Sequence, residues 1–165
     1  MREERGSKIV NRESGSTFED LEVYQVAREF RRAMYGMARE LPEFEKFALA
    51  TQVRRAAVSL TNNIAEGHGR FHFLDQIKFI LQSRGSLEEL IDDLNVCADE
   101  SYLPLEKVAS LKETGWRTRR LIYGYIRYLR GQIKSKESSV REESSEYGAN
   151  GEIDPIHESR CNDSR

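Results

Sequence analysis

Apolar residues recur every three or four positions through four long stretches of the chain, a spacing that places them on one face of a helix. In the first stretch these positions step alternately by four and three: Val23, Ala27, Phe30, Met34, Met37 and Leu41. No stretch shows the alternation of apolar and polar residues that is typical of a strand. The pattern therefore predicts four helices, over about residues 17–41, 43–66, 71–101 and 105–133.

Local signals mark the ends of these helices. Thr17 followed by Asp20 is typical of an N-cap with an acidic residue in the first turn. Pro42 stands where the second helix can begin, and Gly67 stands where it can end. Pro104 separates the third helix from the fourth. Four long helices with short connections predict an all-α fold, an up-down-up-down antiparallel four-helix bundle.

The two ends of the chain have few apolar residues. Residues 1–16 contain only Ile9 and Val10 besides Met1, and residues 134–165 are rich in Ser, Glu and Gly. Such segments cannot bury enough surface to offset their chain entropy, so we expect disordered N- and C-terminal tails. Residues 17–133 then form a single domain.

Charge is balanced in that domain but unevenly placed. Residues 17–133 have 17 basic and 17 acidic side chains, and residues 134–165 have five and eight, so the C-terminal tail is acidic, with a net charge of 5 − 8 = −3. A dedicated nucleic-acid binder usually has a basic excess. Residues 71–101 have a net charge of 2 − 7 = −5, and residues 105–133 have 7 − 2 = +5. We expect these two helices to pair, within one chain or between copies.

The sequence gives little support to an enzymatic function. His68 and His72 have a spacing that can hold a metal on a helix, with Asp75 three positions further on, but a glycine lies between the histidines. Ser83 and Ser86 have no nucleophile elbow and no histidine base, and no phosphate-binding loop or dinucleotide motif occurs. We expect no catalytic residue, metal, cofactor or small-molecule substrate; a metal-dependent enzyme is the remote alternative.

Cysteine content and hydropathy bear on location. Cys97 lies on a predicted helix and Cys161 in the predicted tail, so they do not form a disulfide framework. The first residues lack the apolar core of a signal peptide, and no apolar run approaches membrane-spanning length. We expect a cytoplasmic protein without a membrane partner.

Polar residues adjoin the apolar seam of the second helix, which consists of Leu49, Val53, Ala56, Leu60 and Ile64. Arg84 falls on the seam of the third helix, where a buried guanidinium needs a carboxylate or carbonyls. We predict Glu66 as its first partner and Glu88 as its second. The candidate buried polar network is Gln52, Arg55, Asn63, Glu66, Arg84 and Glu88. We also expect Gly85 to let two helices approach closely.

Three motifs appear in order along the chain: FEDL at residues 18–21, QVRRAAVSLTNNIAEG at residues 52–67 and RGSLEEL at residues 84–90. Over about residues 17–133 the chain resembles the four-helix-bundle family encoded within intervening sequences of bacterial 23S ribosomal RNA genes. The resemblance implies a homo-oligomeric ring, commonly a pentamer, and suggests a connection with RNA. It implies no particular biochemical activity.

The candidate nucleic-acid or interface residues are Arg54, Arg55, Arg70, Arg117, Arg119 and Arg120. Phosphate contacts need basic side chains gathered on one face. The folded part is neutral, and we expect no aromatic stacking residues interleaved with these arginines. Pairing with the acidic third helix, or with its copy in a neighbouring chain, is therefore the favoured interpretation. The predicted function is a non-enzymatic, self-assembling scaffold or adaptor, with RNA or an RNA-associated protein as a possible partner. The alternative is a protein-only interaction module whose basic residues serve ring assembly.

Overall fold

The computed structural model describes residues 17–149, and the side chains of residues 17–138. Four α-helices make up this part: α1 (Glu22–Met37), α2 (Leu49–Gly69), α3 (Phe73–Asp99) and α4 (Leu105–Ala149). Two short 3-10 helices, η1 (Phe18–Asp20) and η2 (Glu43–Glu45), precede α1 and α2. The described residues contain no strand, and the predicted all-α fold is confirmed.

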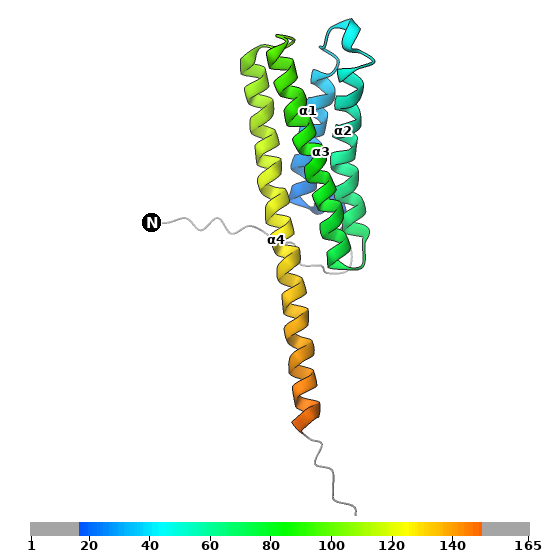
Figure 1. Cartoon of the computed structure of the whole chain (residues 1–165), viewed down its shortest axis with the longest axis vertical. Helices are drawn as coiled ribbons and strands as arrows, with labels where there is room; N and C mark the ends of the chain where they lie inside the picture. Colours follow the sequence, from blue (N-terminus) through cyan, green and yellow to red (C-terminus); the bar gives the residue numbers. More distant parts are fainter. Residues whose placement is uncertain (1–16, 150–165) are drawn as a thin grey trace, which may run out of the picture.

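The helices form a bundle in which each helix packs mainly on two others. α1 packs on α2, α2 on α3, α3 on α4, and α4 on α1. Figure 1 shows the chain going up through α1 and α3 and down through α2 and α4. α2 and α4 therefore lie on a diagonal of the bundle, and their outer surfaces face different directions.

The apolar seams predicted from the sequence form the core. All six seam residues between Val23 and Leu41 are buried, and so are the five between Leu49 and Ile64. Burying one large apolar side chain fully contributes about 1.5–3 kcal/mol. The largest apolar side chains with no exposed surface at all come from all four helices: Phe30, Met34, Leu60, Ile64, Ile80, Leu87, Leu90, Leu94, Ile122 and Leu129.

The predicted N-cap at Thr17 is confirmed, although the element it caps is η1. The Thr17 hydroxyl accepts a hydrogen bond from the Glu19 amide at 3.2 Å, and the Thr17 amide donates to Asp20 Oδ2 at 2.8 Å. This reciprocal arrangement satisfies two backbone amides at the point where the described chain enters the bundle.

The second helix begins later than predicted, at Leu49 instead of residue 43. Residues 43–45 form η2, and the Glu45 carboxylate accepts a hydrogen bond from the Leu49 amide at 3.1 Å. A side chain that caps the first turn cannot belong to that turn, so the acidic residues after Pro42 precede the helix. At the other end, Gly67 lies within the last turn and Arg70 is the C-cap.

Two glycines allow close packing, and neither is Gly85, for which that role was predicted. A Cβ at Gly85 would have no atom within 4 Å. At Gly67 it would lie 3.0 Å from Phe79 Cβ, and at Gly115 it would lie 2.5 Å from Ile91 Cδ1. Gly67 therefore brings α2 against α3, and Gly115 brings α4 against α3 and α1.

α4 continues to Ala149, whereas the sequence predicted a disordered tail from residue 134. Figure 1 shows this extension projecting beyond the other three helices. The predicted disorder considered only burial, but a helix already formed in a bundle propagates at little cost. No Gly or Pro occurs in residues 132–147 to end it. The rest of the predicted C-terminal tail, with Cys161, and the N-terminal tail lie outside the described residues.

Candidate functional site

The predicted buried polar network does not form. Arg55 and Glu66 are exposed, and Asn63 donates to the Ser59 carbonyl one turn earlier on α2 at 2.8 Å. Gln52 is exposed too, although its amide donates to a buried carboxylate on α3. The polar side chains that are buried are a different set: Thr61, Gln76, Ser83, Ser86, Asp93 and Thr118. The polar residues beside the α2 seam therefore point mainly outward.

Two of these buried polar residues, Ser83 and Ser86, form hydrogen bonds between α3 and α2. The Ser83 hydroxyl donates to the Leu60 carbonyl at 2.8 Å, and the Ser86 hydroxyl donates to the Ser59 hydroxyl at 2.8 Å. The sequence gives Ser83 no nucleophile elbow and no histidine base. The structure gives it a packing role, because its hydroxyl is committed to a backbone oxygen.

Asp93 is the buried carboxylate that Gln52 contacts. Gln52 Nε2 donates to Asp93 Oδ1 at 2.7 Å, whereas Oδ2 is buried and has no hydrogen-bond partner. Burial, together with the nearby charge of Glu89, raises the pKa of the Asp93 carboxyl to about 6, against the smaller opposing effect of Gln52. Cys97, one turn further on, is buried as well, and its burial raises the pKa of the thiol to about 11.

Arg84 is half-buried and does not pair with either predicted carboxylate. Glu66 forms an ion pair with Arg70, four residues later on the same side of α2. Glu88 forms one with Arg119 of α4, whose Nε lies 3.0 Å from Glu88 Oε1. The predicted burial of Arg84 is wrong because its seam position lies at the α3–α4 boundary, where a long side chain reaches solvent.

The structure places Arg84 against a tyrosine of α4 instead. Its Nη1 atom lies 3.4 Å from the Tyr123 hydroxyl, and its guanidinium carbon lies 5.8 Å from the centre of the Tyr123 ring. The Arg119 guanidinium also lies 5.8 Å from that ring, and 5.2 Å from the ring of Trp116. The Arg119 and Arg84 guanidinium groups lower the pKa of the Tyr123 hydroxyl, because they stabilise its phenolate form.

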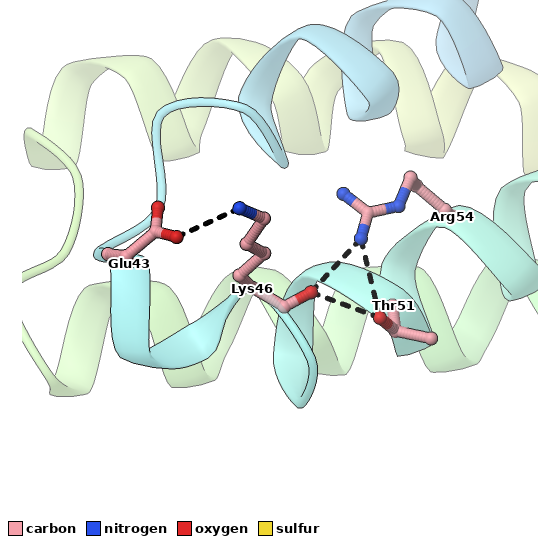
Figure 2. A network of polar contacts seen from close by, with 4 residues as sticks. All are labelled: Glu43, Lys46, Thr51 and Arg54. Carbon is pink, nitrogen blue, oxygen red and sulfur yellow. Dashed lines mark hydrogen bonds and ion pairs between the residues drawn. The ribbon is translucent and has the colours of Figure 1, made fainter.

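The other candidate arginines on α2 have local partners. Arg54 donates to the Lys46 carbonyl at 3.1 Å and to the Thr51 hydroxyl at 3.3 Å, and Lys46 in turn pairs with Glu43 at 2.9 Å. Figure 2 shows these four residues joining the turn before α2 to the first turns of the helix. Arg54 therefore holds the start of α2 in place.

Arg55 and Arg70 differ in their surroundings. Arg55 is exposed and lines two adjoining grooves on α2, of about 490 Å³ and 630 Å³. The smaller groove also contains Phe47 and Glu89, and the larger one contains Tyr35. Arg70 lies over the Phe79 ring at 4.5 Å in addition to its pair with Glu66. Arg54 also lines the larger groove, so Arg54 and Arg55 share that surface, whereas Arg70 lies at the other end of α2.

The α4 arginines, in contrast, belong to a continuous basic segment. Residues 114–136 contain seven Lys and Arg residues and no acidic residue. Arg117 and Arg120 are exposed. Within residues 17–138, the Arg119–Glu88 pair is the one ion pair that joins α4 to α3. The predicted pairing of the acidic and basic helices thus occurs at one point inside the chain, and most of the α4 charge faces solvent.

Aromatic residues also stand in this segment, contrary to expectation. Trp116 and Tyr123 contact Arg119, and Tyr125 stacks on Tyr128 with ring centres 6.2 Å apart. The spacing of Trp116, Arg119 and Tyr123, three and then four residues, is that of one helix face and was visible in the sequence. The six candidate arginines do not share a face of the bundle, because α2 and α4 lie diagonally opposite each other. Of the three on α4, Arg119 lies beside aromatic rings, those of Trp116 and Tyr123.

His68 and His72, whose spacing in the sequence could suit a metal, lie at the ends of different helices. His68 lies in the last turn of α2, whereas His72 is exposed and is the N-cap of α3. No cluster of three or more His, Cys, Asp or Glu side chains suited to a metal occurs in the described part of the chain. In the same part, no helix has the length and apolar character needed to cross a membrane.

No curated protein matches the chain. A family model described as 23S rRNA-intervening sequence protein matches residues 19–124. The match extends from η1 to the middle of α4 and includes the motif-bearing parts of α2 and α3. The chain belongs to the family of 23S rRNA-intervening sequence proteins.

Proposed function

We propose that this protein is a non-enzymatic, self-assembling scaffold that associates with RNA through α4. The observation that carries the proposal is the segment 114–136, with seven basic residues, no acidic ones and one ion pair to the rest of the described chain. Exposed Arg and Lys side chains along a helix attract phosphates, which supply most of the affinity in sequence-tolerant binding. We further propose that it acts in the cytoplasm, in keeping with its two cysteines and the free thiol of Cys97.

Assembly is supported by apolar surface at both ends of the bundle. Phe44 and Phe47, before α2, are 72% and 84% exposed, and Phe71, before α3, is 87% exposed. Large exposed apolar side chains that lie near one another are typical of contact surfaces. The resemblance to ring-forming members of the family suggests five subunits.

A homo-oligomer is therefore our first prediction. Light scattering at micromolar concentration should return about 95 kDa, which is five times the chain mass of 19.1 kDa. Replacing Phe47 by serine should lower that mass if the end of the bundle near η2 takes part in assembly. A mass near 19 kDa for the unaltered chain would exclude self-assembly under these conditions.

The second prediction concerns RNA. A single-stranded RNA should bind with an affinity that falls steeply with salt, because each neutralised phosphate releases counterions. Replacing both Arg117 and Arg120 by glutamine should reduce the slope of log K against log salt by ~1.4, about 0.7 for each single-strand phosphate that is no longer neutralised. The matched control is the same change at Arg28 and Arg32, which are exposed on α1. It removes equal charge and should leave the slope unaltered.

The alternative function is a protein-only module whose arginines contact the acidic α3 of a neighbouring copy. In that case RNA would not bind even at low salt, and the Arg117 and Arg120 changes would lower the oligomer mass. RNA binding that disappears from an intact oligomer supports the proposed function instead.

A further inference from the structure

We infer that Arg84, Trp116, Arg119 and Tyr123 form a binding site for single-stranded RNA on the α3–α4 face, with base stacking on Tyr123 and phosphate contact at Arg84. This inference rests on the RNA association proposed above and assigns it to a particular cluster. The site takes three residues from the basic segment 114–136 and adds Arg84 of α3, so it draws on two helices and combines charge with aromatic rings.

Two guanidinium groups converge on one phenol in this cluster. Arg84 lies 3.4 Å from the Tyr123 hydroxyl, and both Arg84 and Arg119 lie 5.8 Å from the ring centre. For comparison, the guanidinium of Arg70 lies over the Phe79 ring at 4.5 Å. The longer distances, together with the contact at the hydroxyl, place the Arg84 guanidinium toward the hydroxyl end of Tyr123 and not close over its ring face. Tyr123 is 41% exposed, so part of its surface is open to a ligand.

The cluster has an excess of positive charge. Glu88 is the carboxylate that pairs with Arg119, and its Oε1 atom lies 3.0 Å from Arg119 Nε. Arg84 has a neutral partner, the Tyr123 hydroxyl. The cluster therefore has two guanidinium groups and one carboxylate, and that carboxylate pairs with Arg119 alone. Arg84 can exchange its long contact with Tyr123 for a stronger one to a phosphate oxygen.

The combination of groups favours single-stranded RNA among anionic partners. Unpaired bases stack on aromatic side chains. The bases of a duplex are already stacked on one another, and lysines and arginines alone can bind its phosphates. The carboxylates of an acidic protein surface would pair with Arg84 and Arg119. They would not stack on the exposed Tyr123 ring between these two residues. Trp116, half-buried beneath Arg119, is the single tryptophan of the chain and lies close enough to report on binding.

The test is a titration of the full chain with oligouridylate, followed through Trp116 fluorescence and an independent anisotropy measurement. Tyr123→Ala should weaken binding about tenfold or more and leave the salt slope unchanged, because the stacking partner is removed and the charge is kept. Arg84→Gln should weaken binding and reduce the slope by ~0.7, since one phosphate is no longer neutralised. Tyr123→Phe keeps the ring and should bind within about threefold of the unaltered chain.

Arg28→Gln on α1 is the matched control for charge and should bind like the unaltered chain. Thermal melting and light scattering of every variant show whether fold and assembly are intact.

If oligouridylate binds the unaltered chain, and Tyr123→Ala and Arg84→Gln bind it equally well, the RNA association stands and this site is overturned. If a duplex RNA competes as well as oligouridylate, the stacking role is overturned. If no RNA binds the unaltered chain at low salt, the proposed function itself fails. If Arg84→Gln lowers the oligomer mass, the cluster is a subunit contact and the inference fails.

Discussion

Replacing Gly115 by valine should destabilise the bundle by about 1–3 kcal/mol or more, one of the largest effects of a single substitution in this protein. A Cβ at this position would lie 2.5 Å from Ile91 Cδ1 and 3.2 Å from Phe30 Cζ, well inside van der Waals contact. Ile91 and Phe30 are both buried, so neither can move without disturbing the packing around it. Chemical denaturation followed by helical circular dichroism measures the decrease in stability.

Gly124 on the same helix provides the control. A Cβ there would meet no atom within 4 Å, and the residue is exposed. Gly124→Ala should therefore stabilise the chain by about 0.5–1 kcal/mol, because alanine favours the helix and glycine does not. Equal stability of Gly115→Val and Gly124→Ala would show that α4 does not approach α1 and α3 closely at Gly115.

Asp93 should make the stability of the fold decrease as pH rises from 4 to 7. The pKa of its carboxyl rises from an ordinary value of 3.8 to about 6 in the folded chain, so the folded state keeps the proton over a range in which the unfolded state has released it. Stability from this group is fully present below pH 3.8 and is lost as pH rises through about 6. The difference between the two pKa values corresponds to up to ~3 kcal/mol.

The measurement compares the unaltered chain with Asp93→Asn at a fixed protein concentration, because assembly also affects apparent stability. The unfolding free energy of the unaltered chain minus that of Asp93→Asn should fall between pH 4 and pH 7. Asp92→Asn is the matched control, since Asp92 is the exposed neighbour of the buried residue. A difference that is constant or rises with pH would mean that a cation reaches Asp93 Oδ2 in solution.

The core could be predicted from the sequence because periodicity depends only on local spacing. Every predicted seam residue from Val23 to Leu41 and from Leu49 to Ile64 is buried. Helix ends were predicted less well. The acidic residues after Pro42 resemble a first turn, but Glu45 serves as a cap for the Leu49 amide, a choice made by side-chain geometry.

The candidate site was harder to predict, because it depends on which helices are neighbours. The alternating spacing of four and three residues places Arg84 on the apolar seam of α3. Periodicity alone does not show that this position lies at the boundary with α4, where the side chain reaches solvent. Gly85 and Gly115 are both glycines within helices, and only tertiary packing separates the exposed one from the buried one. The alternation of Arg119 with Trp116 and Tyr123 was available in the sequence and was missed.

The unequal length of the helices has a consequence for any ring built from this chain. α4 projects past the other three helices at one end of the bundle (Figure 1). In a ring whose bundles stand along the rotation axis, the rotation carries every projection to the same side of the assembly, so the two sides of the ring would be chemically different. One side would present a circle of helical arms, and the other would present the turns before α2 and α4. Such an assembly has a polarity, and a partner that binds the arms would meet the ring from one direction only.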